Sequence, residues 1–296
     1  MLTESQLARV SVVLVRARNP ANIGAVARAM HDFGFSSLRV VNEFLPPLEA
    51  AKSAVDASEV MAAARTFPSV AEAVADCTLV IGTTAVGERQ LHHELFNLPE
   101  AAPRIHTELA HDSARIAILF GSEKTGLSNE ELSHCHWLLT IPMHEHEGTR
   151  HASMNLGQAA AVCLWELVRT AGSPQSTDCP ESDTPGLQSR HSGAASPMRG
   201  FGPGDITIAE PPRHSLLRGD SPAMPGTVPA GSLERIAELF NEVLDKSEYT
   251  RRHAASSNPI HIRRLVRRIG IDAIDAPIWM GILRQILWKL NGGRDD

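Results

Sequence analysis

The sequence predicts an α/β fold with a parallel β-sheet, followed by a small all-α domain. Short runs of branched apolar residues alternate with stretches of helical periodicity over residues 1–171. That alternation is typical of a parallel sheet with helices on both faces. A Pro-, Gly- and Ser-rich segment follows, and after it only helical periodicity returns. We therefore expect a sheet domain at 1–171, a disordered linker at 172–231 and a three-helix domain at 232–296.

Five apolar runs are predicted to form the strands of the sheet. They are Val10–Val15, Leu38–Val41, Leu79–Thr83, Ile116–Phe120 and Trp137–Ile141. Apolar positions at helical spacing predict helices in the stretches around them. These stretches are 19–33, 49–76 and 155–170. Ser128 and Glu131 add a capping box for a short helix between the last two strands.

Composition bounds the class of protein. At 296 residues the chain can form one large core and a small accessory domain, and its net charge of −6 argues against a protein that is basic overall. No signal-peptide pattern and no membrane-spanning segment is expected. Four scattered cysteines without a CxxC pair favour a reduced, cytoplasmic protein with no cysteine zinc site. They are Cys77, Cys135, Cys163 and Cys179.

Small and polar residues follow two of the predicted strands where each strand ends. The runs are Gly82–Ala85 and Gly121–Leu127. Such residues suit a ligand crevice at the carboxyl edge of the sheet. Ser153 and Asn155 stand where a loop becomes the last helix of this domain, so they are either plain N-caps or caps that also bind a ligand. Neither GxGxxG nor GxxxxGK[ST] occurs, which speaks against a conventional nucleotide-binding fold.

The C-terminal region is predicted to form three helices, the second opening at Asn258–Pro259 and the third running from about Pro277 to Leu290. In the second helix we expect four apolar residues to point inward: Ile262, Leu265, Val266 and Ile269. Six arginines and no carboxylate lie between Tyr249 and Arg268. Cations so close repel one another unless an anion joins them, so they are interpreted as an RNA-binding surface, with a solvated helix face as the alternative. They are Arg251 and Arg252, and Arg263, Arg264, Arg267 and Arg268 on the outside of the second helix.

Three segments carry a family resemblance: NPANIGAVARAM at Asn19–Met30, LFGSEKTGLSNEEL at Leu119–Leu132, and IPM with ASMNLGQA within Ile141–Ala159. They resemble the three motifs of the SpoU class of SPOUT RNA ribose 2′-O-methyltransferases. The resemblance implies a deep trefoil knot, a homodimer and S-adenosylmethionine as the cofactor. With its all-α extension, the chain looks most like the TrmJ family of tRNA methyltransferases, which act on cytidine or uridine at position 32 of the anticodon loop.

The resemblance also implies the residues of the site. Its catalytic set corresponds to Asn22, Arg28, Glu123, Ser153 and Asn155. Its cofactor contacts correspond to Thr83, Thr84, Ala85, Gly121, Ile141, Ala152, Ser153 and Met154. Two positions depart from the family pattern. Ser122 stands where relatives commonly carry Arg or Asn, and the loop Met143–Ala152 is longer. The loop histidines His144, His146 and His151 are interpreted as solvated, so no metal is expected.

The role of Arg28 is open at this point. The resemblance casts Arg28 as the base, but a guanidinium stays protonated in almost any setting. Clamping the phosphate next to the target ribose is the chemically safer role. Arg28 lies off the apolar stripe of its helix, and the plain alternative is a surface pair with Asp32 one turn later. Two other functions remain as alternatives: methylation of ribosomal RNA, and a knotted RNA-binding protein without catalysis.

Overall fold

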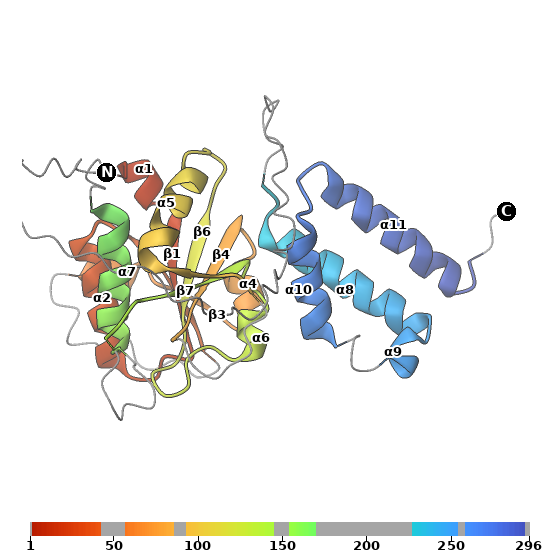
Figure 1. Ribbon diagram of the computed structural model, residues 1–296, viewed down its shortest axis with the longest axis horizontal. Coiled ribbons are helices and arrows are strands. Elements are labelled where there is room, and N and C mark those ends of the chain that lie inside the picture. Colours follow the sequence, from red (N-terminus) through yellow and green to blue (C-terminus); the bar gives the residue numbers. More distant parts are fainter. Residues whose placement is uncertain are drawn as a thin grey trace, which may run out of the picture. The chain divides into compact units, whose positions relative to one another are not determined.

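A computed structural model describes residues 2–42, 57–85, 93–144, 154–169, 227–253 and 258–293. Seven parallel strands form one sheet in the order β3-β2-β1-β6-β4-β7-β5 (Figure 1). The strands are β1 Val10–Val15, β2 Ser37–Val41, β3 Arg65–Phe67, β4 Leu79–Thr83, β5 Leu95–Asn97, β6 Ile116–Phe120 and β7 Trp137–Thr140. The parallel sheet and its five predicted strands are confirmed. The strands β3 and β5 were not predicted, because each has only three residues and none of them is fully buried.

The helices of this part of the chain lie between the strands. They are α1 Glu4–Leu7, α2 Pro20–Asp32, α3 Ser58–Ala62, α4 Val70–Ala73, α5 Leu98–Leu109, α6 Asn129–Leu132 and α7 Leu156–Val168. The prediction of one helical region at 49–76 is wrong, since β3 separates α3 from α4; residues 43–56 lie outside the described part. The helix α5 was missed because Pro99 and Pro103 mask its helical pattern. The capping box of Ser128 and Glu131 is confirmed at the start of α6.

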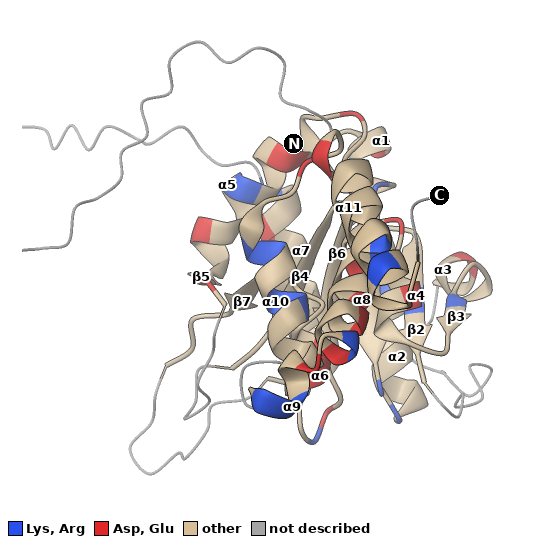
Figure 2. Ribbon diagram, turned by 90° about the vertical axis from the view of Figure 1, so that its right-hand side faces the viewer, with Lys and Arg blue, Asp and Glu red and all other residues tan. Residues whose placement is uncertain are grey.

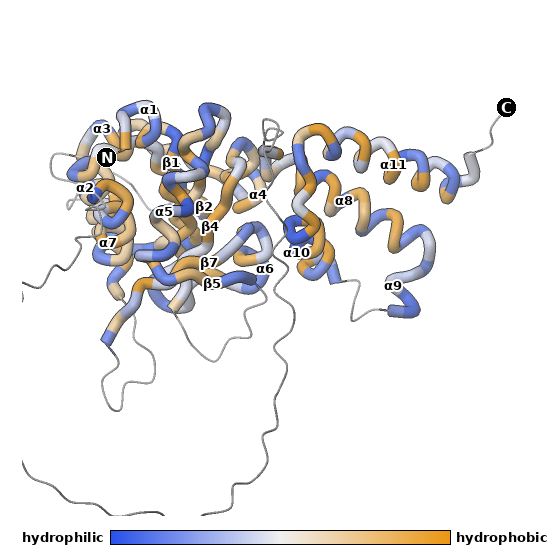
Figure 3. The backbone as a smooth tube through the Cα atoms, turned by 45° about the horizontal axis from the view of Figure 1, so that its top comes forward, coloured by the Kyte–Doolittle hydropathy of each residue, from blue (hydrophilic) through white to orange (hydrophobic). Residues whose placement is uncertain are grey.

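The sheet is buried on both faces, as its continuous apolar strands require. Along β1, Val12 and Leu14 pack into a cluster with α2, α5 and α7, whereas Val13 and Val15 pack into a second cluster with α4 and α6. Figure 3 shows the strands as the hydrophobic centre of this region. Each side chain that is fully buried in this way contributes about 1.5–3 kcal/mol of transfer free energy.

Near the C-terminus, the helices are α8 Ala230–Lys246, α9 Tyr249–Arg252, α10 Pro259–Ile269 and α11 Asp275–Leu290. Three were predicted, and the short α9 is an addition. Their shared core includes Ile236 of α8, Val266 of α10 and Leu283 of α11. The Asn258 side chain caps α10 by accepting from the N–H of Ile260 at 2.9 Å. The boundaries at 171/172 and 231/232 stay a prediction, and the linker expected to be disordered lies almost wholly outside the described residues.

The predicted orientation of α10 is wrong for three of its four arginines. The side chains of Arg263 and Arg267 are 17% and 3% exposed, and Arg264 is buried as well. Leu265 and Ile269, which were expected to point inward, are exposed. The reason is that α10 packs against α8 on one side and against α6 on another, which helical periodicity alone does not reveal.

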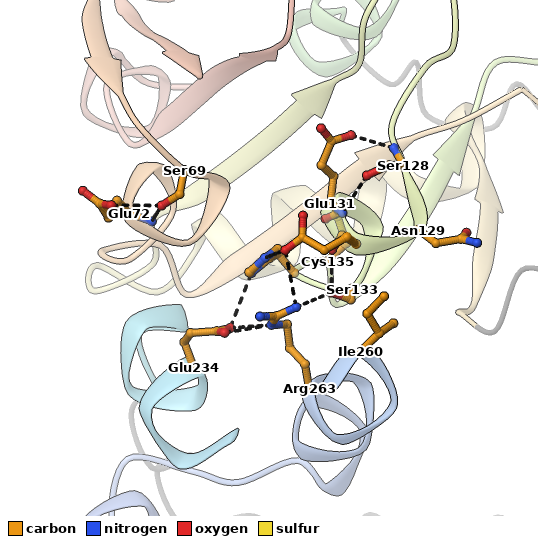
Figure 4. A network of polar contacts seen from close by, with 12 residues as sticks. Ser69, Glu72, Ser128, Asn129, Glu131, Ser133, Cys135, Glu234, Ile260 and Arg263 are labelled. Atoms are coloured by element: carbon orange, nitrogen blue, oxygen red, sulfur yellow. Dashed lines mark hydrogen bonds and ion pairs between the residues drawn. The ribbon is translucent and has the colours of Figure 1, made fainter. Parts of the chain in front are cut away.

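One carboxylate pairs with two of these arginines. Glu234 of α8 accepts from Arg263 Nε at 2.8 Å (Figure 4). It also accepts from Arg267 Nη2 at 3.2 Å. Arg263 also donates to Ser133 Oγ at 2.9 Å, and Arg267 donates to the carbonyl of His134 at 3.2 Å. Burial alone would raise the pKa of Glu234, but His134 and the two guanidiniums lower it to about 2. Ionised Glu234 therefore joins α8, α10 and the residues that follow α6.

This pKa predicts a pH dependence of stability. Because the folded-state pKa of Glu234 lies below its usual value of 4.5, its contribution is complete above pH 4.5 and is lost as the pH falls towards 2. Glu234→Gln should lower the free energy of unfolding at pH 7 by about 3 kcal/mol, since it leaves buried cations uncompensated. It should also flatten the loss of stability between pH 4.5 and 2, as measured by urea unfolding.

Glu238→Gln is the matched control, because Glu238 is 55% exposed and pairs only with Arg235 on the same helix in the described part of the chain. Its effect should stay below about 0.5 kcal/mol. Equal losses in the free energy of unfolding for the two substitutions would show that Glu234 contributes no more to stability than an exposed carboxylate.

Candidate functional site

Three of the predicted cofactor segments lie along one edge of the sheet. The strands β6, β4 and β7 are neighbours in the parallel sheet. Their carboxyl ends therefore place Gly121, Thr84 and Ile141 next to one another, as expected of a crevice at this edge. Ala152 and Ser153 lie outside the described residues, and Met154 stands directly before the N-cap of α7. The cofactor roles of all these residues stay a prediction.

The local hydrogen bonds at this edge fix its backbone. Thr83 Oγ1 donates to the carbonyl of Leu119 at 2.8 Å, and the N–H of Thr84 donates to the carbonyl of Leu139 at 2.9 Å. A Cβ on Gly121 would lie 2.1 Å from the carbonyl carbon of Gly126, because the turn folds back over it. Any substitution of Gly121 would therefore disturb the turn itself, and Ala85, which is exposed, is the better place to test ligand binding.

Three of the predicted catalytic residues form a chain of hydrogen bonds. Asn22 Nδ2 donates to Glu123 Oε1 at 3.0 Å, and Asn155 Nδ2 donates to Asn22 Oδ1 at 3.1 Å. The residues come from the first turn of α2, the turn after β6 and the N-cap of α7. The parallel pairing of β1 with β6 explains why Asn22 and Glu123 lie close together. The chain runs from the end of β1 into α2, which carries Asn22, and from the end of β6 into the turn that carries Glu123.

Close packing of α2 against α7 explains the rest. A Cβ on Gly157 would lie 2.6 Å from Ala25 Cβ, which is too close for two side chains. Glycine at this position lets the first turns of the two helices approach. The same first turn carries Asn155, whose Oδ1 accepts from the N–H of Gly157 at 2.9 Å. Asn155 is thus an N-cap whose side chain also contacts Asn22, and its role in binding a ligand stays a prediction.

Glu123 is held in its ionised form. Partial burial raises the pKa of this carboxyl, but hydrogen bonds from Asn22 and from the backbone of Glu123, Arg18 and Asn19 outweigh burial and lower it. One of these bonds, from the N–H of Asn19, measures 3.4 Å. An ionised carboxylate accepts hydrogen bonds and donates none, so it fixes the amide of Asn22 with its oxygen towards Asn155.

Arg28 lies outside this chain of hydrogen bonds. It is exposed, as predicted, and its Nε lies 4.0 Å from Asp32 Oδ2. Six residues along a helix correspond to a rotation of about 240°, so Arg28 and Asn22 point to different sides of α2. The surface pair with Asp32 is therefore present, and it leaves half of the Arg28 side chain accessible to a substrate.

Sequence reasoning missed Arg16, which holds the turn after β6. Its backbone is left-handed, with φ of 57°. Its guanidinium donates to both oxygens of Glu131, at 2.5 and 2.9 Å, and to the carbonyl of Gly126 at 3.0 Å. Burial would raise the pKa of Glu131, but hydrogen bonds from Arg16 and Ser128 lower it. No periodicity signals such a residue; the local sign is a cation directly after a buried strand.

A pocket of 360 Å³ opens beside Asn22 and Glu123. Three cations contribute to its lining together with short polar side chains. The lining residues are Arg16, Arg18, Asn19, Asn22, Ser122, Glu123, Lys124 and Thr125. Ser122 Oγ and Thr125 Oγ1 are 2.9 Å apart. A pocket that combines cations with amide and hydroxyl groups suits an anionic, hydrogen-bonding ligand such as a phosphodiester.

Metal and thiol chemistry find no support in the described residues. No group of three or more His, Cys, Asp or Glu side chains suited to a metal ion occurs in that part of the chain. His146 and His151 of the long loop lie outside it.

Cys77, Cys135 and Cys163 are free and buried, and burial raises the pKa of each thiol to about 12. Such thiols are not nucleophiles at neutral pH. No helix of the described part is long and apolar enough to cross a membrane.

A comparison of the sequence with models of protein families identifies the class to which this fold and site belong. A family model described as the SpoU rRNA Methylase family matches residues 9–165. The match spans more than half of the chain, which therefore belongs to the SpoU methylase family.

The names of individual relatives indicate a more specific activity than the family description does. The chain is 35% identical over 162 residues to the tRNA (cytidine/uridine-2′-O-)-methyltransferase TrmJ of Pectobacterium atrosepticum, a match covering 54% of this chain and 64% of that protein. It is 35% identical over 159 residues to the tRNA (cytidine-2′-O-)-methyltransferase TrmJ of Methanocaldococcus jannaschii, covering 53% of this chain and 66% of that protein. The matched region is thus just under two thirds of each relative. The crystal structure of TrmJ from Z. mobilis ZM4 superposes with a TM-score of 0.66 at 25% identity, covering 93% of this chain and 98% of that one.

The α2–α7 contact can be tested by exchanging its two small residues. Gly157→Ala should force α7 away from α2, lower the free energy of unfolding by about 1–3 kcal/mol and separate Asn155 from Asn22. That separation should also lower the rate of methylation. The double variant Ala25→Gly with Gly157→Ala should recover most of this rate, because one methyl group again lies between the helices.

The free energy of unfolding of the double variant should fall short of full recovery by about 1 kcal/mol, because a glycine inside a helix costs that much. Thermal unfolding and methylation assays on the three variants measure both effects. A double variant as inactive as Gly157→Ala would show that close approach is not what positions Asn155.

Proposed function

We propose that the protein is an S-adenosylmethionine-dependent tRNA ribose 2′-O-methyltransferase acting on cytidine or uridine at position 32 of the anticodon loop. The observation that carries the proposal is the chain of hydrogen bonds from Glu123 through Asn22 to Asn155, beside the pocket and next to the strand ends. The TrmJ relatives and the similarity to a TrmJ crystal structure over 93% of the chain support the choice of tRNA.

The strand ends fit the cofactor in their chemistry. Ala85 is small and Ile141 is partly exposed, so the edge offers apolar surface beside the backbone groups of Thr84 and Gly121. Bound there, S-adenosylmethionine would supply a methyl group already activated by the positive sulfonium, without a metal. The protein then has to hold the ribose hydroxyl in line with that methyl group, and positioning of this kind supplies much of the acceleration.

The protein's own residues divide this work. Ionised Glu123 fixes Asn22, and Asn22 in turn fixes Asn155 at the start of α7. The two amides can thus orient the ribose beside the pocket, with Ser153 as a further predicted contact. Arg28, on another side of α2, clamps a phosphate next to the target nucleotide through its guanidinium.

The RNA surface is revised by the structure. Arg263 and Arg267 are engaged with Glu234, so we assign first contact with phosphates to Arg251, Arg252 and Arg268, which are exposed. The cations of α9 are visible in Figure 2. Arg18 and Lys124 of the pocket extend the RNA contacts to the site itself. The role first predicted for Arg264 has no support in its buried position.

The remaining features of the proposal come from family membership. We propose a trefoil knot formed by the chain around β7 and α7, a homodimer that includes the sheet domain, an all-α C-terminal domain and a cytoplasmic location. The position of β7 between β4 and β5, and the packing of α7 against α2, are compatible with such a knot.

Two substitutions separate chemistry from folding. Asn155→Ala should lower methylation by on the order of a hundredfold, because a preorganised contact to the reacting group is lost. Arg28→Ala should do the same and leave the melting temperature unchanged, because its pair with Asp32 is exposed and worth less than about 0.5 kcal/mol. Calorimetric titration of S-adenosylmethionine should give wild-type affinity for both variants. Full activity of Arg28→Ala would remove its proposed role.

The substrate is tested by mass spectrometry of ribose methylation in total RNA from a deletion strain. Loss of the 2′-O-methyl group at position 32 of tRNA is the expected result. Loss from ribosomal RNA would establish the alternative substrate, and no loss in either RNA would favour an RNA-binding protein without catalysis. Cofactor binding can be followed separately with Ala85→Trp, which should abolish it without unfolding the chain.

A further inference from the structure

The helix α11 has two apolar faces, and the core uses only one. Ala276, Leu283 and Leu287 pack into the cluster with α8 and α10. A second set of large apolar side chains is exposed in a row with a spacing of four residues. This row, called here the α11 isoleucine row, consists of Ile274, Ile278, Ile282, Ile286 and Leu290, which are 66, 55, 49, 39 and 42% exposed. Residues four apart form a ridge on a helix, the element that packs into the grooves of another helix.

A glycine lies in α11 beside this row. Gly281 lies in the middle of α11, where glycine is unfavourable compared with alanine. In the described part of the chain, no atom lies within 4 Å of the position that its Cβ would take. Packing among the residues that the structure describes therefore gives no reason for this glycine. A notch next to a ridge of isoleucines permits a second helix to approach closely.

The row is also symmetric about its centre. If a second α11 lies antiparallel with a two-fold axis beside Ile282, Ile278 meets Ile286 and Ile274 meets Leu290. The same register brings Asp275 of one helix to Lys289 of the other. Both charged residues are exposed. Antiparallel helices also place opposite ends of their dipoles together.

We propose that the α11 isoleucine row binds the same row of a second copy of this chain, antiparallel, across a two-fold axis beside Ile282. One surface that is complementary to itself is what an isologous interface requires. The matching of Asp275 with Lys289 favours this occupant, because the polyanionic backbone of RNA would gain little from an uncharged row. This contact does not involve the methylation site, so it holds or fails independently of the proposed function.

A cysteine on the axis tests the contact directly. In the full chain carrying Cys179→Ser, Ile282→Cys should form a covalent dimer on mild oxidation, because a two-fold axis brings the two introduced thiols together. Arg235→Cys in the same background is the matched control, since Arg235 is 52% exposed on α8. The cross-linking rate should be at least tenfold higher for Ile282→Cys. A dimer formed only through the sheet domain would not produce this difference, and equal rates would overturn the proposal.

Charge exchange tests the antiparallel register. In the Ile282→Cys background, Asp275→Lys and Lys289→Asp should each slow cross-linking, because each places like charges opposite one another. The two changes together should restore the original rate. A combined variant that cross-links no faster than the single ones would overturn the register. If Ile282→Cys is not cross-linked while Ile282→Asp, folded by circular dichroism, binds tRNA more weakly, the row binds RNA and the proposal fails.

Discussion

The contact between Ala25 of α2 and Gly157 of α7 is the constraint on which the candidate site depends. The helices come from the two ends of the matched family region, and each begins at an asparagine cap. Their close approach leaves no room for a side chain on Gly157. The polar first turns must then face each other, and the turn after β6 brings a carboxylate to the same place. A parallel sheet supplies the frame, but this one helix contact sets the distance between the amides.

Much of this arrangement could be predicted because it rests on strong local signals. The five longer strands were found from their apolar runs, and Asn22, Glu123 and Asn155 were found from motifs that occur at strand and helix ends. What joins them could not be predicted. The contact of Gly157 with Ala25 is set by tertiary packing, and Arg16 acts through a left-handed backbone and a distant partner, Glu131. Neither leaves a periodic trace in the sequence.

Apart from α5, whose prolines mask its pattern, the errors lie in elements that are buried on two sides or on none. The edge strands β3 and β5 are too short and too exposed to show an apolar pattern. The helix α10 shows a clear amphipathic pattern, yet its arginines face protein rather than solvent. A guanidinium can be buried when a carboxylate and backbone carbonyls satisfy it. The sequence marks α10 as amphipathic, but the partner of its polar side, Glu234, lies about thirty residues earlier in the chain.

The buried group of Glu234, Arg263 and Arg267 also limits how this protein can diverge. Replacing Glu234 alone leaves two largely buried guanidiniums without this carboxylate, whereas replacing all three by apolar residues of similar volume can be neutral or favourable. Replacement of Glu234 alone should thus be selected against, and homologues that lack it should also lack the two arginines. The same reasoning warns against exchanging α8 or α10 alone when chimeric enzymes are built, because each helix carries only part of one electrostatic unit.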